Sequence, residues 1–154
     1  MNAALPLIEY GRNGFMKLIE GLTPEQLNKV PDGFNNNLIW NLGHLIATQQ
    51  QICYSRAGQD PGIDADVIES YSQGSKPNAP LSAEAIQWIK EEAVKSLDQL
   101  EKDVASGKFK DYPAFTVTKD NIPIKSIHDA LDFLSWHESM HWGYAQALKR
   151  AVAA

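Results

Sequence analysis

The stretch His137-Glu138-Ser139-Met140-His141 places two imidazoles four residues apart with a carboxylate between them. Side chains with this spacing lie on one face of a helix, and two histidines so arranged are typical metal ligands. On a helical wheel both histidines fall in the same arc as Leu134 and Leu148, so they point toward the core. Two imidazoles in an apolar stripe need a partner such as a divalent cation. The stretch therefore predicts a long helix that carries part of a metal site.

Proline breaks helix interiors, so windows without proline are candidate helices. Four such windows cover residues 7–23, 32–60, 81–112 and 124–154. Ser82 and Ser126 are N-cap candidates for the last two helices, and Gly107 is the expected end of the third. The segment Thr23-Pro24-Glu25-Gln26 predicts a short additional helical turn.

Two long connections separate these windows, at roughly residues 58–81 and 107–125. The second contains Phe115-Thr116-Val117-Thr118, which predicts a short strand. Nothing in the sequence supports a full sheet or an internal repeat. We therefore predict an all-α four-helix bundle with long connecting loops, formed by a single domain over residues 1–154.

The composition narrows the function classes. The chain has 154 residues, a formal charge of −5 and an isoelectric point near 5.3. No basic patch suits nucleic acid or an acidic membrane surface, so neither is an expected partner. Cys53 is the only cysteine, and no signal-peptide pattern opens the sequence, which predicts a cytoplasmic protein.

A third histidine, His44, lies in the second predicted helix. Its face of that helix is polar and aromatic, which suits a pocket wall. Three neutral imidazoles would leave a coordination position open for water or substrate. Cys53 lies on the far side of the same helix, so we exclude it from this site. The predicted pocket residues are Trp40, Asn37, Gln51 and Tyr144.

The opposite face of the second helix carries Ile39, Leu42, Gly43 and Ile46. A helix with two such faces needs two partners. Together with Trp88, which lies off the main stripe of the third helix, this face predicts a homodimer. The alternative is that the bundle core and a long loop cover both faces.

Two segments resemble the DinB-like, or YfiT-like, metal-binding four-helix bundles. Asn36 to Leu45 is similar to the second-helix pattern N-x-x-W-x-x-x-H-L, and His137 to Gly143 is similar to the signature H-E-x-x-H-x-G-Q. Their order and their separation of about ninety residues make the pair more specific than either segment alone. The chain departs from the signature at Tyr144, where the family often has glutamine.

The resemblance covers essentially the whole chain and implies a function. It makes His44, His137 and His141 the ligands of a divalent metal ion, usually nickel or zinc, and it implies frequent dimerisation. Characterised relatives include metal-dependent transferases that use low-molecular-weight thiols. The expected activity is therefore a metal-dependent thiol transfer to a small-molecule substrate, and the alternative is a non-catalytic stress-response or ligand-binding protein.

Other interpretations of the polar residues stay open. Glu138 is a candidate general base or a carboxylate supporting the ligands, and a salt-bridge partner on the helix flank is equally compatible. We expect Arg12 to extend from the edge of its stripe into water, and His128 to lie on the surface. The H-E-x-x-H string also permits a zinc peptidase or another metal-dependent hydrolase. The peptidase ranks low because the thirteen residues after His141 contain no third ligand.

Overall fold

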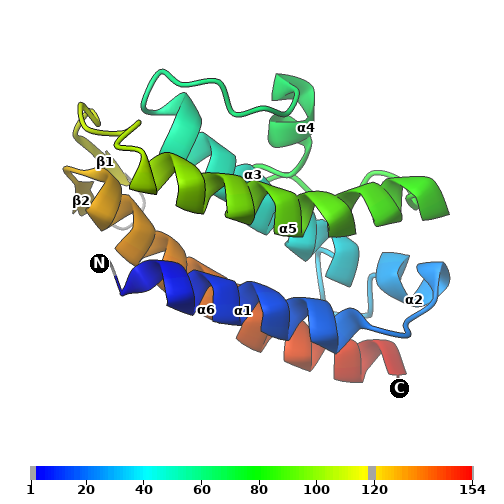
Figure 1. The fold of residues 1–154 in the computed structure, drawn as a ribbon. Coiled ribbons are helices and arrows are strands. Elements are labelled where there is room, and N and C mark those ends of the chain that lie inside the picture. Colours follow the sequence, from blue (N-terminus) through cyan, green and yellow to red (C-terminus); the bar gives the residue numbers. More distant parts are fainter. Residues whose placement is uncertain (1–2, 118–120, 154) are drawn as a thin grey trace.

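Four long helices lie side by side, as the four proline-free windows predict (Figure 1). The computed structural model describes residues 3–117 and 121–153. The long helices are α1 (Ala4–Ile19), α3 (Leu38–Gln50), α5 (Ala83–Ala105) and α6 (Ile127–Ala153). The shorter elements are α2 (Pro24–Asn28), the π-helical turn η1 (Gln51–Ser55) that continues α3, α4 (Ala65–Ser70), β1 (Phe115–Val117) and β2 (Ile122–Ile124).

The directions of the helices explain the two long connections. In Figure 1, α1 and α6 run in one direction, whereas α3 and α5 run in the other. Because α3 and α5 are consecutive long helices that run in parallel, the chain must return along the whole bundle between them. The segment 56–82 makes this return and carries α4, a short helix within a stretch whose sequence predicts only a connection. The predicted all-α four-helix bundle is confirmed.

Side-chain caps set the helix starts where the sequence predicts them. The Thr23 hydroxyl accepts from the Gln26 backbone N–H, and the Gln26 side chain accepts from the Thr23 N–H, forming a complete capping box. Ser82 caps α5 through the Ala85 N–H. The Ser126 hydroxyl accepts from the Asp129 N–H and caps α6. The Asp129 carboxylate accepts from the backbone N–H of Lys125. Helix α1 begins three residues before the proline-free window 7–23. Pro6 lies in its first turn, where backbone N–H groups have no partner within the helix, so the missing N–H of proline costs nothing.

The connection between α5 and α6 forms an antiparallel hairpin in which Phe115 pairs with Ile124 and Val117 with Ile122. The predicted short strand is therefore present as β1. Its fourth predicted residue, Thr118, lies outside the described residues. The hairpin packs on one end of the bundle, where Ile124 is buried in the core.

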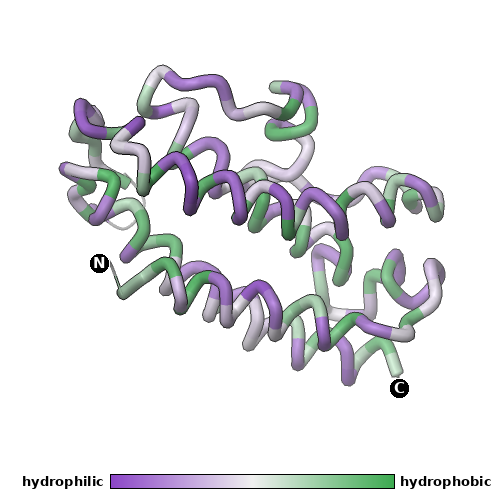
Figure 2. The backbone as a smooth tube through the Cα atoms, viewed as in Figure 1, coloured by the Kyte–Doolittle hydropathy of each residue, from purple (hydrophilic) through white to green (hydrophobic). Residues whose placement is uncertain are grey.

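The bundle interior consists of two apolar clusters with polar side chains between them. Figure 2 shows hydrophobic and hydrophilic residues alternating along the long helices, as amphipathic helices require. One cluster includes Ile8, Leu100 and Leu134, and the other includes Phe15, Leu45 and Leu148. Within the described ranges, every helix is too short or too polar to cross a membrane.

Four buried polar residues, one from each long helix, lie between the two clusters, and we call them the central polar layer. They are Arg12, Gln49, Ser96 and Glu138. Arg12 is 1% exposed, so the expectation that it extends into water is wrong. Its guanidinium donates to both carboxylate oxygens of Glu138, to the Gln49 side chain at 3.2 Å and to the backbone oxygen of Ala93 at 2.8 Å. This arginine therefore links α1 to the other three long helices.

Both faces of α3 are covered within the chain. Ile39, Leu42 and Ile46 belong to an apolar cluster. Gly43 lies under the ring of Tyr71, since a Cβ at this position would lie 2.5 Å from that ring. The idea that this face is free for a second copy is wrong, because the bundle core and the return segment cover it. The predicted homodimer stays a prediction without this support.

Removal of one partner from the buried ion pair should be costly, because the other charge stays buried without compensation. We expect Arg12→Met to lower the free energy of unfolding by roughly 3–5 kcal/mol. Glu138→Met should behave similarly, and the double variant should lose less than the sum of the two. Urea unfolding of the single and double variants measures this coupling.

The matched control is Lys95→Met, since the Lys95 side chain is 74% exposed and pairs with Glu92. Exposed pairs contribute less than about 1 kcal/mol. If Arg12→Met costs no more than Lys95→Met, the central polar layer does not stabilise the bundle.

Candidate metal centre

The three histidines that the sequence singled out come together between α3 and α6. One ring nitrogen from each of His44, His137 and His141 lies within 4.8 Å of the others, which forms a cluster that could hold a metal ion. The Nε2 atoms of His44 and His137 are 3.2 Å apart. With Zn–N bonds of about 2.0–2.1 Å, two nitrogens of a tetrahedral site lie about 3.3–3.4 Å apart. The spacing therefore matches a shared cation.

His44 is held so that Nε2 faces the cluster. Its Nδ1 lies 2.7 Å from the backbone oxygen of Tyr71. A carbonyl oxygen only accepts, so Nδ1 carries the proton and donates, and Nε2 keeps its lone pair. The Trp40 ring stacks on this imidazole, with centroids 5.0 Å apart and planes 9° apart. The return segment and α3 thus fix this imidazole together.

His141 is fixed in the same way by a side chain. Its Nδ1 lies 2.9 Å from Oδ1 of Asn41. The Asn41 amide nitrogen donates to the Asn36 side chain and to the backbone oxygen of Asn37, which determines the orientation of the amide. Asn41 Oδ1 must therefore accept from His141, and the lone pair of His141 is on Nε2. Hydrogen bonds of this kind orient metal-binding histidines.

His137 is the least constrained of the three. Its Nδ1 is buried and makes no hydrogen bond to any residue that the structure describes. Buried polar atoms without a partner are rare in native proteins. The Nε2 atoms of His137 and His44 are close enough to need a proton between them, and a bound cation would take the place of that proton. The donor set fits a divalent ion held by three neutral imidazoles.

Burial keeps these imidazoles uncharged. Desolvation is the main cause that lowers the pKa of all three. The pKa of His137 falls to about 2, with further contributions from His141, His44 and Arg12, and that of His141 falls to about 4. Metal ions bind neutral imidazole, so the cluster is in its ligating form at neutral pH.

Glu138 does not join the histidines. Although it lies between them in the sequence, its carboxylate is 2% exposed and faces α1, where both oxygens accept from Arg12. Gly11 makes room for it, because a Cβ there would lie 2.8 Å from Glu138 Cγ. The flank salt bridge considered from the sequence is present, but as a buried pair. Its role as a general base stays a prediction.

Other sequence-based expectations can be located. Cys53 is buried outside the histidine cluster, and His128 is exposed at the start of α6. Of the predicted pocket residues, Trp40 and Asn37 line a cavity next to the centre. Asn37 is also the N-cap of α3, and its amide nitrogen donates to Asn28.

The other two predicted pocket residues do not line this cavity. Gln51 is exposed at the start of η1, and Tyr144 is 36% exposed with its ring edge against Phe34. The helical wheel places both residues on the same side of their helices as the histidines, but it does not describe how far along the helix axis each residue lies. Neither contributes to the wall of the cavity.

Sequence reasoning missed the two residues that orient the ligands, Asn41 and Tyr71. Asn41 lies three residues before His44, on the same face of α3, so the wheel offered a signal that it could contact an imidazole. Tyr71 acts through its backbone oxygen, which no side-chain pattern reveals. Its position depends on the path of the return segment.

The fold and the cluster define a helical-bundle protein with a largely buried three-histidine cluster. A comparison with protein families matches residues 7–145 to the DinB superfamily. The chain therefore belongs to the DinB superfamily. Searches of curated proteins and of solved structures found no match.

We expect the purified protein to contain one divalent ion per chain, because three oriented imidazoles converge on one point. His44→Ala and His141→Ala should each lose most of this metal, since either change leaves two ligands. Elemental analysis measures the content. The matched control His128→Ala, at the exposed histidine, should keep it. Folded His44→Ala and His141→Ala proteins with stoichiometric metal would show that the ion is bound elsewhere.

The metal-free protein should lose stability in mild acid. The pKa values of His137 and His141 in the folded protein, about 2 and about 4, lie below the ordinary value of about 6.5. At pH values between the folded and the ordinary pKa, the unfolded chain therefore binds more protons than the folded protein. Stability present above pH 6.5 is lost as the pH falls toward 4. Urea unfolding in chelator at several pH values measures the slope.

Two variants assign that slope to the cluster. Replacement of His137 and His141 by Gln together should flatten it, because glutamine does not titrate. His128→Gln should leave it unchanged. An identical slope in all three proteins would mean that other groups cause the acid sensitivity.

Proposed function

We propose that this chain binds one divalent ion, nickel or zinc, through His44, His137 and His141. The single observation that carries the proposal is the convergence of three ring nitrogens within 4.8 Å, two of them with the other nitrogen engaged by a fixed acceptor. Neutral nitrogen donors suit both ions. No carboxylate belongs to the cluster within the described part of the chain, so the ligands supply no negative charge.

We propose further that the centre serves a metal-dependent transfer of a low-molecular-weight thiol to a small electrophile. A divalent ion with three neutral ligands supplies a positive charge that favours a thiolate at the remaining position. This is the chemistry that the family resemblance implies. The burial of the imidazoles supports it, because a site with little water strengthens the attraction between opposite charges.

The protein residues have separate roles in this proposal. Tyr71 and Asn41 keep two imidazoles turned toward the ion. Glu138 is occupied by Arg12, so solvent is a better candidate than Glu138 to accept the proton that the thiol loses. Arg12 also helps to keep His137 unprotonated, because its positive charge lowers the pKa of that imidazole.

The alternatives differ in what they require of Glu138. A peptidase of the H-E-x-x-H type uses this glutamate as the base that activates water. The bidentate contact with Arg12 argues against that role. A non-catalytic protein that uses the metal for stability or ligand capture requires nothing of Glu138 and is the remaining alternative.

Cobalt substitution tests the proposed thiol chemistry. We expect the cobalt protein to develop a sulfur-to-metal charge-transfer band when glutathione, cysteine or another small thiol is added, because three histidine ligands would leave a position for sulfur. His137→Ala should lose the band, and His128→Ala should keep it. Absorption spectroscopy is the measurement.

Absence of the band with every small thiol would contradict the transferase proposal and favour the non-catalytic alternative. Peptide cleavage that disappears in Glu138→Gln would also contradict it, in favour of the peptidase.

A further inference from the structure

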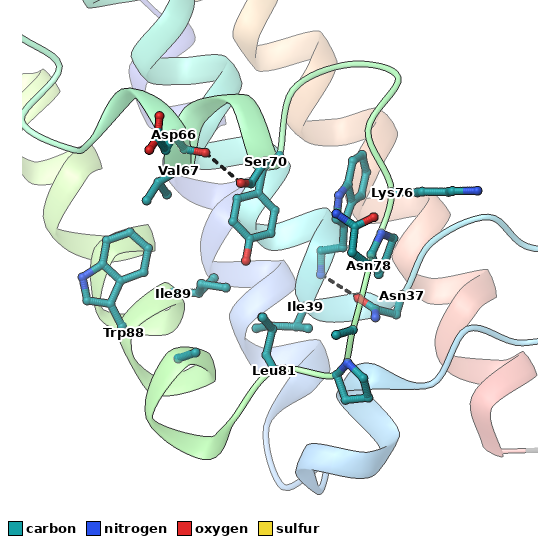
Figure 3. A pocket seen from close by; sticks show the side chains of 16 residues that line it. Asn37, Ile39, Asp66, Val67, Ser70, Lys76, Asn78, Leu81, Trp88 and Ile89 are labelled. Carbon is teal, nitrogen blue, oxygen red and sulfur yellow. Dashed lines mark hydrogen bonds between the residues drawn. The ribbon is translucent and has the colours of Figure 1, made fainter.

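A cavity of about 460 Å³ lies next to the metal centre, outside the histidine cluster (Figure 3). Residues of α3, α4, α5 and the segment 76–81 form its walls. This volume lies within the range of pockets that bind small molecules. None of the three histidines lines it, so the cavity is a separate site.

The walls of the cavity are mainly apolar. Figure 3 shows Ile39, Val67, Leu81, Trp88 and Ile89 around the hollow, and the Lys76 side chain points away from it. Trp88 is 40% exposed although it is a large aromatic residue. The two charged residues of the lining, Asp66 and Lys76, carry opposite charges, so the mainly apolar and aromatic walls favour a neutral ligand with a flat apolar surface.

The Tyr71 hydroxyl is one polar group of the cavity lining that can hydrogen-bond a ligand. Tyr71 is half-buried, and its hydroxyl makes no hydrogen bond within the described ranges of the chain. The residue is held rigidly, because its backbone oxygen accepts from His44 and its ring packs on Gly43. A phenol hydroxyl carries its proton at neutral pH. It can therefore donate to a ligand or accept from one.

We propose that this cavity binds a neutral small molecule that combines one aromatic ring system with one polar group paired to the Tyr71 hydroxyl. Four separate segments surround the cavity, so a compact molecule contacts all of them at once. The proposal does not depend on the metal or on thiol transfer, because the cavity residues act without either.

The test uses 2-naphthol and naphthalene, which share a ring system and differ by one hydroxyl. We expect calorimetry to find one 2-naphthol bound per chain. Ala85→Leu, which places a larger side chain in the cavity wall, should weaken binding at least fivefold. The matched control is Ala83→Leu, at an exposed position of the same helix, and it should bind as the wild type does.

Tyr71→Phe tests the polar contact. A lost hydrogen bond corresponds to an affinity loss of about fivefold. We expect this loss for 2-naphthol, with naphthalene bound equally well by both proteins. Equal loss for both ligands would overturn the role of the hydroxyl.

A measurement on the unaltered protein avoids any folding defect of the variants. In proton–nitrogen NMR spectra, 2-naphthol should shift the indole N–H signal of Trp88 and leave that of Trp136, on α6, unchanged. No binding at millimolar 2-naphthol, equal affinity of Ala85→Leu and Ala83→Leu, or a shift at Trp136 alone would overturn the proposal.

Discussion

The guanidinium of Arg12 lies at the centre of the bundle, where its N–H groups reach acceptors on the three other long helices. A buried charge is tolerated only where it is paired and hydrogen-bonded, so these contacts restrict how the helices can be arranged. Glu138 must face α1, and Gly11 must leave room for it. The rotation of α6 about its axis follows from this one pair, and with it the directions of the residues on either side of Glu138.

The histidine cluster depends on that rotation. On a helical wheel, His137 lies about 100° and His141 about 60° from Glu138 on the same side, so both turn toward α3 when Glu138 faces α1. There they meet His44, whose ring is held by the Tyr71 backbone and by Trp40. The H-E-x-x-H stretch thus has two separate tasks in this protein. Its histidines face the candidate metal centre, and its glutamate completes the central polar layer.

Much of this arrangement can be predicted from the sequence. The apolar stripes and the caps at Thr23, Ser82 and Ser126 are local signals, and they predict the long helices and the short α2. The inward direction of the three histidines can also be predicted, because it follows from helical spacing alone. The pairing of Arg12 with Glu138 cannot be predicted in this way. The two residues lie 126 positions apart in the sequence, and a lone arginine at the edge of an apolar stripe is normally solvated. The carbonyl of Tyr71 and the covering of Gly43 depend on the path of the return segment, which side-chain periodicity does not encode.

Anomalous X-ray diffraction from crystals of the zinc-loaded protein, recorded on both sides of the zinc absorption edge, tests the central claim most directly. The account predicts one strong anomalous peak about 2.0–2.1 Å from a ring nitrogen of each of His44, His137 and His141, with Glu138 still paired to Arg12. A peak at other residues, a peak coordinated by Glu138, or the absence of any peak in zinc-loaded crystals would contradict it.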